Sequence, residues 1–265
     1  MKISILVPTR ERMNHRLTLI FSILSTVDDI NNVDIYFGVD KDDPTLETIK
    51  KIAAGISCLK IVEIENNGEF LGLGKLWNIL AETSDAEIIS MINDDYVFKT
   101  QGWDTMLLEE FASMPEDKIQ AIHCNDEKHG KDLPVNLFCH RKYAEVLGQF
   151  MRPEFTINWV DQWLHQMFLA FDRIKYREDY TIEHRHWLYG KRGRDTTAER
   201  MAKADTTVVN NQPTSFSDNL WHQMVDERIE DVKKLAAHIK QEPNWSVVDT
   251  GDKIVNYENS AVATN

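Results

Sequence analysis

The chain has 265 residues, of which 42% are hydrophobic, and this length fits one large domain or one domain with an extension. Its formal net charge of −13 at pH 7 means that the overall field does not steer the protein to nucleic acid, although a local basic groove stays compatible with it. The cysteines are few and far apart, which favours reduced, buried thiols over a disulfide framework or a zinc site. No stretch approaches the roughly 20 apolar residues of a membrane span, and the first apolar run is too short for a signal peptide, so we expect a soluble, cytoplasmic protein.

Apolar residues in the first half of the chain alternate between the spacing of strands and the spacing of helices. Pro8 ends the first apolar run, and Pro44 stands at a helix start, a position that proline favours. Such alternation is typical of a mostly parallel sheet with helices on both faces. We expect strands at 2–7, 33–39, 59–64, 87–92 and 119–124, and helices at 15–26, 44–56, 75–80 and 103–114.

The second half of the chain is less regular. Its patterns predict a strand at 135–140, helices at 141–147 and 160–170, and short strands near Ile174 and Ile182. Asp218 is expected to cap a long helix that ends near Ile239. After Gln241 the sequence is polar, and we expect a poorly ordered tail.

Polar residues follow several strands of the predicted sheet. They are residues 9–12, Asp40 and the triplet Asn93-Asp94-Asp95. Open α/β sheets bind ligands beyond the carboxyl ends of their strands. Adjacent carboxylates need positive compensation, and Mg²⁺ and Mn²⁺ prefer oxygen ligands, so a divalent cation is the natural partner. Taken alone, an Asp-Asp pair at a strand end fits a helix cap or a turn as well.

The order of these motifs resembles that of family 2-like glycosyltransferases with a GT-A fold. The opening strand, the acidic residue that closes the second strand, and a helix-strand block ending in a DxD-like triplet follow one another as in that family. The similarity covers about residues 2–110 well and the remainder loosely. It rests on segments 3–10, 36–40, 74–78 and 86–95.

The resemblance implies an α/β fold of the GT-A type. Its mostly parallel sheet would be flanked by helices and would join a Rossmann-like nucleotide-binding half to an acceptor-binding half, with a C-terminal helical extension. The expected boundaries are 1–110 for the nucleotide-sugar half, 111–212 for the acceptor half with a flexible loop, and 213–265 for the C-terminal helix and polar tail.

The same resemblance assigns roles at the strand ends. Asp95, the last residue of the triplet, inherits the metal, while Asp94 or Asn93 would contact the ribose or a metal-bound water. Asn93 stands where the family has an aspartate, so an amide replaces a carboxylate there. The nucleoside would be held by Pro8, Thr9, Arg10 and Asp40, and the diphosphate approached by Arg12 and Lys75. The three cations among them could instead serve surface solubility.

Asp161 lies between Trp159 and Trp163 at a predicted helix start. In related inverting enzymes an acidic residue there deprotonates the acceptor hydroxyl, and the aromatic neighbours suit sugar stacking. The alternative is that Asp161 caps the helix or interacts with its dipole. Glu183 and Asp195 are the next candidates for the base.

A late loop carries histidines and then cations. By the resemblance His184 would complete the metal shell, with His186 as its competitor. Segment 190–194 is basic and contains glycines, so it resembles the flexible lid that closes over the donor diphosphate. Lys191 and Arg192 would meet the phosphates there.

Together these features predict a metal-dependent glycosyltransferase. It would move a sugar from a nucleoside diphosphate, UDP in the first instance, to a hydroxyl with inversion, using Mn²⁺ or Mg²⁺ as Lewis acid. The acceptor would be a glycan or, because 185–200 is basic, a hydroxymethylated pyrimidine in viral DNA. One alternative is a nucleotidyltransferase, although residues 9–12 lack the glycines typical of that class. Another is a sugar-nucleotide-binding or glycan-binding module without catalysis.

Overall fold

The structure is a computed structural model that describes residues 1–186, 190, 195–209 and 212–251. Within these residues, eight strands form one sheet in the order β3-β2-β1-β4-β7-β6-β8-β5, and a separate hairpin pairs β9 with β10. The strands are β1 (Ile3–Thr9), β2 (Val33–Asp40), β3 (Leu59–Ile64), β4 (Ile88–Met91), β5 (Tyr96–Phe98), β6 (Ala121–Asn125), β7 (Leu137–His140), β8 (Ile174–His184), β9 (Thr206–Val209) and β10 (Gln212–Ser215).

Strand direction explains where the polar strand ends meet. β3, β2, β1 and β4 run parallel, so their carboxyl ends share one edge of the sheet. Thr9, Asp40 and the residues after Met91 therefore come together. β7 runs antiparallel to β4 and β6, whereas β6 and β8 are parallel. The sheet is thus parallel in its N-terminal half and mixed beyond it.

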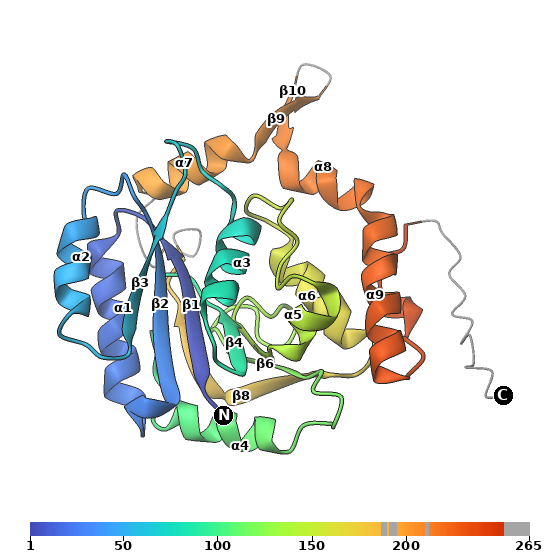
Figure 1. The fold of residues 1–265 in the computed structure, drawn as a ribbon. Coiled ribbons are helices and arrows are strands. Elements are labelled where there is room, and N and C mark those ends of the chain that lie inside the picture. Colours follow the sequence, from blue (N-terminus) through green and yellow to red (C-terminus); the bar gives the residue numbers. More distant parts are fainter. Residues whose placement is uncertain (187–189, 191–194, 210–211, 252–265) are drawn as a thin grey trace.

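Both faces of the sheet are apolar and covered by helices. Along β1, Ile5 and Val7 join one core and Leu6 joins the other. The first core is closed by α1 (Met13–Thr26), α2 (Leu46–Ala53) and α4 (Trp103–Ala112). The second is closed by α3 (Leu73–Thr83), α5 (Lys142–Leu147), α6 (Val160–Leu169) and α9 (Val225–Ile239). In Figure 1, α9 lies outermost, beyond α5 and α6.

The elements expected in the first 124 residues are all present, although α2 begins at Leu46 rather than Pro44. The two short strands expected near Ile174 and Ile182 are instead one long strand, β8. It pairs with β6 at its start and with β5 at its end. Residues 177–179 are polar and partly exposed, and they lie next to a register shift. The apolar sequence pattern is therefore interrupted at these residues, although the strand continues through them.

The prediction of a single long C-terminal helix is also wrong. α8 (Phe216–Gln223) ends before Met224, and α9 starts after it. Ser215, not Asp218, caps α8, because its hydroxyl accepts a hydrogen bond from the Asp218 N–H at 3.1 Å. Sequence patterns did not reveal β5, the hairpin, or α7 (Thr196–Ala204), which Figure 1 shows between the sheet and the hairpin.

The first part of the tail is packed rather than poorly ordered. The Asn244 N–H donates to the Ala170 carbonyl at 2.7 Å, and the Trp221 indole donates to Asp249 at 2.7 Å. Val248 is buried in the second core. Residues 252–265 lie outside the described part of the chain. No helix in the described part is long and apolar enough to cross a membrane.

The start of α3 packs directly against the loop between α5 and α6. The N–H groups of Leu73 and Gly74 donate to the carbonyls of Thr156 and Phe155, at 2.7 and 3.2 Å. A Cβ atom on Gly74 would lie 2.1 Å from the Arg152 carbonyl oxygen. Glycine is required at this position because backbone meets backbone without room for a side chain.

The substitution Gly74→Ala should therefore lower the free energy of unfolding by about 2 kcal/mol, the scale of an overpacked core. Urea unfolding measures the change. Gly55→Ala is the matched control, because its new methyl group would meet its nearest neighbour at an ordinary 3.6 Å. Equal unfolding free energies for the two variants would contradict the close packing at α3.

Candidate functional site

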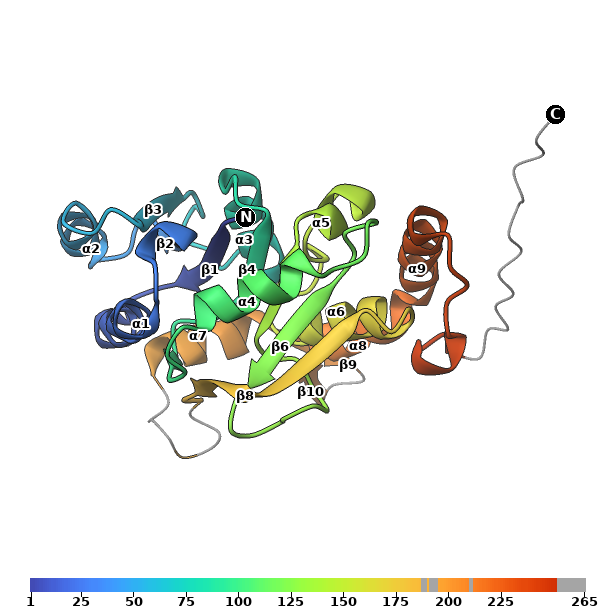
Figure 2. The ribbon, with the colours of Figure 1, turned by 90° about the horizontal axis from the view of Figure 1, so that it is seen from below.

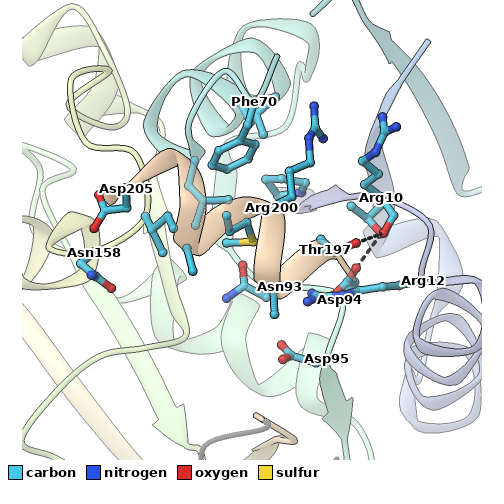
Figure 3. A pocket seen from close by; sticks show the side chains of 18 of the residues that line it. Arg10, Arg12, Phe70, Asn93, Asp94, Asp95, Asn158, Thr197, Arg200 and Asp205 are labelled. Carbon is cyan, nitrogen blue, oxygen red and sulfur yellow. Dashed lines mark hydrogen bonds and ion pairs between the residues drawn. The ribbon is translucent and has the colours of Figure 1, made fainter. Parts of the chain in front are cut away.

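A cavity of about 490 Å³ opens at the carboxyl edge of the parallel strands (Figure 3). Most residues expected to bind nucleotide or metal line it, whereas Lys75 is exposed on α3 and is not among the lining residues. Asp161 and His184 are likewise not lining residues. Lys191 and Arg192 lie outside the described residues. The expected residues on the wall are Pro8, Thr9, Arg10, Arg12, Asp40, Asn93, Asp94 and Asp95.

Asp94 is held by its neighbours at the strand edge. It is 2% exposed, and it accepts hydrogen bonds from the Thr9 hydroxyl at 2.7 Å and from Arg12 at 2.9 Å. The Thr9 hydroxyl in turn accepts from Arg16, a fully buried cation that also donates to Asp43 at 2.6 Å and to the Thr45 hydroxyl at 2.7 Å. Both oxygens of Asp94 are engaged by the protein, so this carboxylate organises the edge.

Arg12 connects the triplet to α7. Its guanidinium also donates two bonds of 2.9 Å to Asp195, whose carboxylate caps α7 by accepting from the Ala198 N–H at 2.8 Å. Burial alone would lower the pKa of the Arg12 guanidinium, but the carboxylates of Asp94 and Asp195 raise it above its ordinary value. Asp195 is therefore a structural anchor of α7 in this arrangement.

Asp40 also lines the cavity, and it pairs with two cations. One of its oxygens accepts from Arg10 at 2.9 Å and from Arg200 at 2.7 Å. The Arg200 guanidinium also lies 5.8 Å from the centre of the Phe70 ring. Sequence analysis placed Arg200 only in the basic stretch 185–200 and did not single out Phe70. Asp195 followed by helix-forming residues was a readable start signal for α7, but no local pattern marked Phe70.

Asp95 and His184 meet although 89 residues separate them in sequence. Antiparallel pairing of β5 with β8 sets Tyr96 opposite His184, with their rings stacked 4.3 Å apart. The Arg185 N–H donates to the Asp95 carbonyl at 2.9 Å, which fixes the same alignment. As a result the Asp95 carboxylate and the His184 Nε2 atom lie 3.4 Å apart.

This donor set fits a divalent cation. Neighbouring ligands in an octahedral shell of about 2.1 Å radius are about 3 Å apart, close to the observed separation. The described residues contain no group of three or more metal-ligating side chains. Mg²⁺ commonly keeps water and substrate phosphate oxygens among its ligands, so a site with a carboxylate and an imidazole from the protein is compatible with it. His186 lines the cavity with its ring 5.2 Å from that of His184.

Asp161 lies in the first turn of α6, and its carboxylate accepts from the Gln162 N–H at 2.8 Å. Burial raises the pKa of the Asp161 carboxyl, and the nearby imidazoles of His129 and His184 partly oppose this shift. Trp159 is the N-cap residue and makes no side-chain cap bond, so Asp161 is the residue whose carboxylate meets a free N–H of the first turn.

The aromatic neighbours of Asp161 are occupied by packing. Trp163 is 2% exposed and belongs to the second core. Trp159 stacks on Trp221 with ring centres 4.6 Å apart, and its indole N–H donates to Asp218. The expectation that both tryptophans flank Asp161 as sugar platforms is therefore wrong for Trp163.

A scan against protein-family models finds no match, and a search of curated proteins finds none. Solved structures do match. TarS of S. aureus has 16% sequence identity and a TM-score of 0.54, over 90% of this chain and 43% of that chain. Mannosyltransferase PcManGT from Pyrobaculum calidifontis, in complex with GDP-Man and Mn²⁺, has 13% identity and a TM-score of 0.57, over 90% and 74%. GalNAc-T7 with UDP, GalNAc and Mn²⁺ has 9% identity and a TM-score of 0.57, over 69% and 44%.

These likenesses establish the fold. It is of the GT-A type, which confirms the fold class and the resemblance inferred from the sequence. The chain spans less than half the length of TarS, 43% of it.

Removal of Arg12 should lower the free energy of unfolding strongly, because the buried carboxylate of Asp94 loses its cation. Arg12→Met removes the cation that pairs with Asp94, whose side chain is 2% exposed, and breaking a buried ion pair typically costs about 3–5 kcal/mol of unfolding free energy. Lys175→Met is the control, because it removes an ion pair between Glu110 and a lysine whose side chain is 50% exposed. Such a surface pair contributes less than about 1 kcal/mol. Similar losses for both variants in urea unfolding would contradict this role of Arg12.

Proposed function

We propose that this chain is a metal-dependent glycosyltransferase that uses a nucleoside-diphosphate sugar, with UDP as the nucleotide. The observation that carries the proposal is the meeting of Asp95 and His184 beside a cavity whose wall includes Arg12. A site with a place for a cation and with a guanidinium beside it suits a diphosphate.

Asp95 and His184 would hold Mn²⁺ or Mg²⁺. When bound, the metal supplies a Lewis acid that stabilises negative charge on the departing diphosphate. Arg12 is positioned beside the triplet to add further compensation. Asp94 contributes indirectly, because it orients Arg12 and Thr9 instead of facing the cation.

Asp161 is the proposed general base. It would take the proton of the acceptor hydroxyl while that oxygen forms a bond to the anomeric carbon of the sugar. The bond from this carbon to the diphosphate oxygen breaks, and the nucleoside diphosphate leaves with both electrons. Attack opposite the leaving group inverts the anomeric centre. The raised pKa of the Asp161 carboxyl makes it a stronger base than an ordinary aspartate.

The neighbouring structures agree with this donor class. PcManGT is described with GDP-Man and Mn²⁺, and GalNAc-T7 with UDP, GalNAc and Mn²⁺. A nucleotidyltransferase or a binding module would not release a nucleoside diphosphate from a sugar donor. A screen of donors with the purified chain, reading released nucleoside diphosphate with and without Mn²⁺, separates these functions.

A glycan is the proposed acceptor. Figure 3 shows Asn158 and Asp205 at the end of the cavity away from Arg10 and Arg12. Thr214 and Ser215 also line the cavity, and the Ser215 hydroxyl donates to the buried Asp205 at 2.6 Å. Hydroxyl and amide groups suit a polyhydroxylated acceptor, while the Asp205 carboxylate disfavours the phosphates of DNA.

Replacing Asp95 tests the metal site. Asp95→Ala should abolish sugar transfer and weaken UDP binding in the presence of Mn²⁺, because a carboxylate ligand is lost. EDTA should reproduce the effect in the unsubstituted protein. Glu82→Ala, which removes an exposed carboxylate on α3, should leave both properties unchanged. Undiminished turnover of Asp95→Ala would end the assignment of Asp95 to the metal.

Replacing Asp161 tests the base. Asp161→Asn should slow transfer by about 10²- to 10⁴-fold while UDP affinity, measured by calorimetry, stays nearly constant. Because burial raises the pKa of this carboxyl, acidification protonates the base at a higher pH than for an ordinary aspartate. The wild-type rate should therefore decline on the acid side, and the variant should lack this decline.

The matched control for the base is Asp172→Asn, an exposed aspartate beyond the other end of α6. It should transfer sugar at the wild-type rate. A rate for Asp161→Asn within about threefold of wild type would remove Asp161 from the mechanism. A loss of UDP affinity as large as the loss of rate would assign it to the donor site instead.

A further inference from the structure

Arg200 has a donor group that the protein leaves unused. Its Nη1 atom donates to Asp40 at 2.7 Å. Its Nη2 atom is buried and has no hydrogen-bond partner among the described residues. A buried donor without an acceptor is unfavourable, and Arg200 lines the cavity, so a ligand atom is the natural partner.

Asp40 offers the complementary group beside it. Its Oδ2 atom accepts from both Arg10 and Arg200, whereas its Oδ1 atom takes part in no hydrogen bond within the described part of the chain. Asp40 also lines the cavity. A donor on Arg200 and an acceptor on Asp40 therefore stand next to each other, joined by an ion pair that fixes their relative position.

Phe70 adds a flat apolar surface at the same end. Its ring centre is 5.8 Å from the Arg200 guanidinium, and the ring lines the cavity. Figure 3 shows Arg200 beside Phe70, with Asn93 between them and Asp95. Arg200 thus lies at the end of the cavity away from the proposed metal ligands, where a nucleoside rather than a diphosphate would sit.

From this geometry we infer that Arg200, a residue of α7, selects the nucleobase of the donor together with Asp40, the residue that the resemblance already assigns to the nucleoside. An N–H of the base would donate to Asp40 Oδ1, and the adjacent carbonyl oxygen would accept from Arg200 Nη2. Uracil, thymine and guanine carry such a neighbouring N–H and C=O pair. Cytosine and adenine present a ring nitrogen acceptor and an amino donor instead. Their ring nitrogen would face the acceptor on Asp40, and their amino group would face the donor on Arg200. Phe70 would stack against the base.

The inference rests on the proposed function, since it assigns the base of the same donor. It adds a specificity-determining residue, Arg200, which lies 160 residues after Asp40 in the sequence. It also gives α7 a role in recognising the base, in addition to lining the cavity.

The test compares UDP with CDP, which differ only in this edge of the pyrimidine ring. Calorimetry of the full chain with Mn²⁺ should show UDP binding at least about tenfold more tightly than CDP, because a site built for one hydrogen-bonding edge rejects the other. Arg200→Met should weaken UDP binding by about 10- to 100-fold, the value of a hydrogen bond to a charged group. CDP binding should change by less than about threefold, so the preference for UDP collapses.

Arg200→Lys separates base reading from simple charge attraction. It keeps the positive charge and loses the planar fork, so it should lose the preference for UDP as Arg200→Met does. Lys203→Met is the control, because it removes an exposed cation from the same helix and should leave both affinities unchanged. Thermal unfolding of each variant verifies that α7 and the rest of the fold are retained.

Equal affinities of the unsubstituted protein for UDP and CDP would overturn the inference and leave the proposed function standing. Equal losses for both nucleotides in Arg200→Met would also overturn it, by assigning Arg200 to the phosphates. If no nucleoside diphosphate binds in the presence of Mn²⁺, the proposed function itself fails and this inference fails with it.

Discussion

The arrangement of the site depends on Arg12, which lies between two carboxylates that would otherwise repel each other. Asp94 comes from the end of the parallel sheet and Asp195 from the start of α7. The parallel strands bring several acidic residues to one edge, and like charges there need compensation before the chain can close. Arg12 supplies it with three hydrogen bonds of 2.9 Å, and by doing so it fixes α7 over the cavity.

A similar compensation occurs on either side of Arg12. Arg16 is fully buried and pairs with Asp43, and Arg200 pairs with Asp40. Buried ion pairs contribute modestly to stability, but they make a wrong arrangement costly. The acidic edge is therefore both the candidate chemical centre and the part of the fold that specifies how the C-terminal segments dock. The net charge of the chain says nothing about this local balance of cations and carboxylates.

Adjacent residues of the triplet have different surroundings. Asp94 is saturated by Thr9 and Arg12, whereas Asp95 faces His184. This division follows from their position in the turn between β4 and β5, where Asp94 meets the end of β1 and Asp95 meets the end of β8. It also explains how Asn93 can replace an aspartate at the first position, because the proposed metal ligands do not include it. Binding and catalysis in the proposed mechanism thus rest on one carboxylate of the triplet, and structure on its neighbour.

The sequence by itself determined the local part of this protein. Buried parallel strands leave near-continuous apolar runs, so β1 to β4 and the helices between them could be predicted, as could the gathering of Thr9, Asp40 and Asp95 at one edge. The regions that failed were those where local pattern and tertiary pairing disagree. β8 crosses an exposed polar stretch without ending, and β5 is only three residues long.

Only the tertiary structure decided which distant residues complete the site. Arg12 and Asp195 are 183 residues apart in sequence, and Arg200 and Asp40 are 160 apart. His184 reaches Asp95 only because β8 pairs with β5 as well as with β6. Residue type and spacing report which segments form a helix or a strand, since these depend on neighbours along the chain. They do not report which strand edges pair or which opposite charges meet, because those contacts form only when the segments pack together.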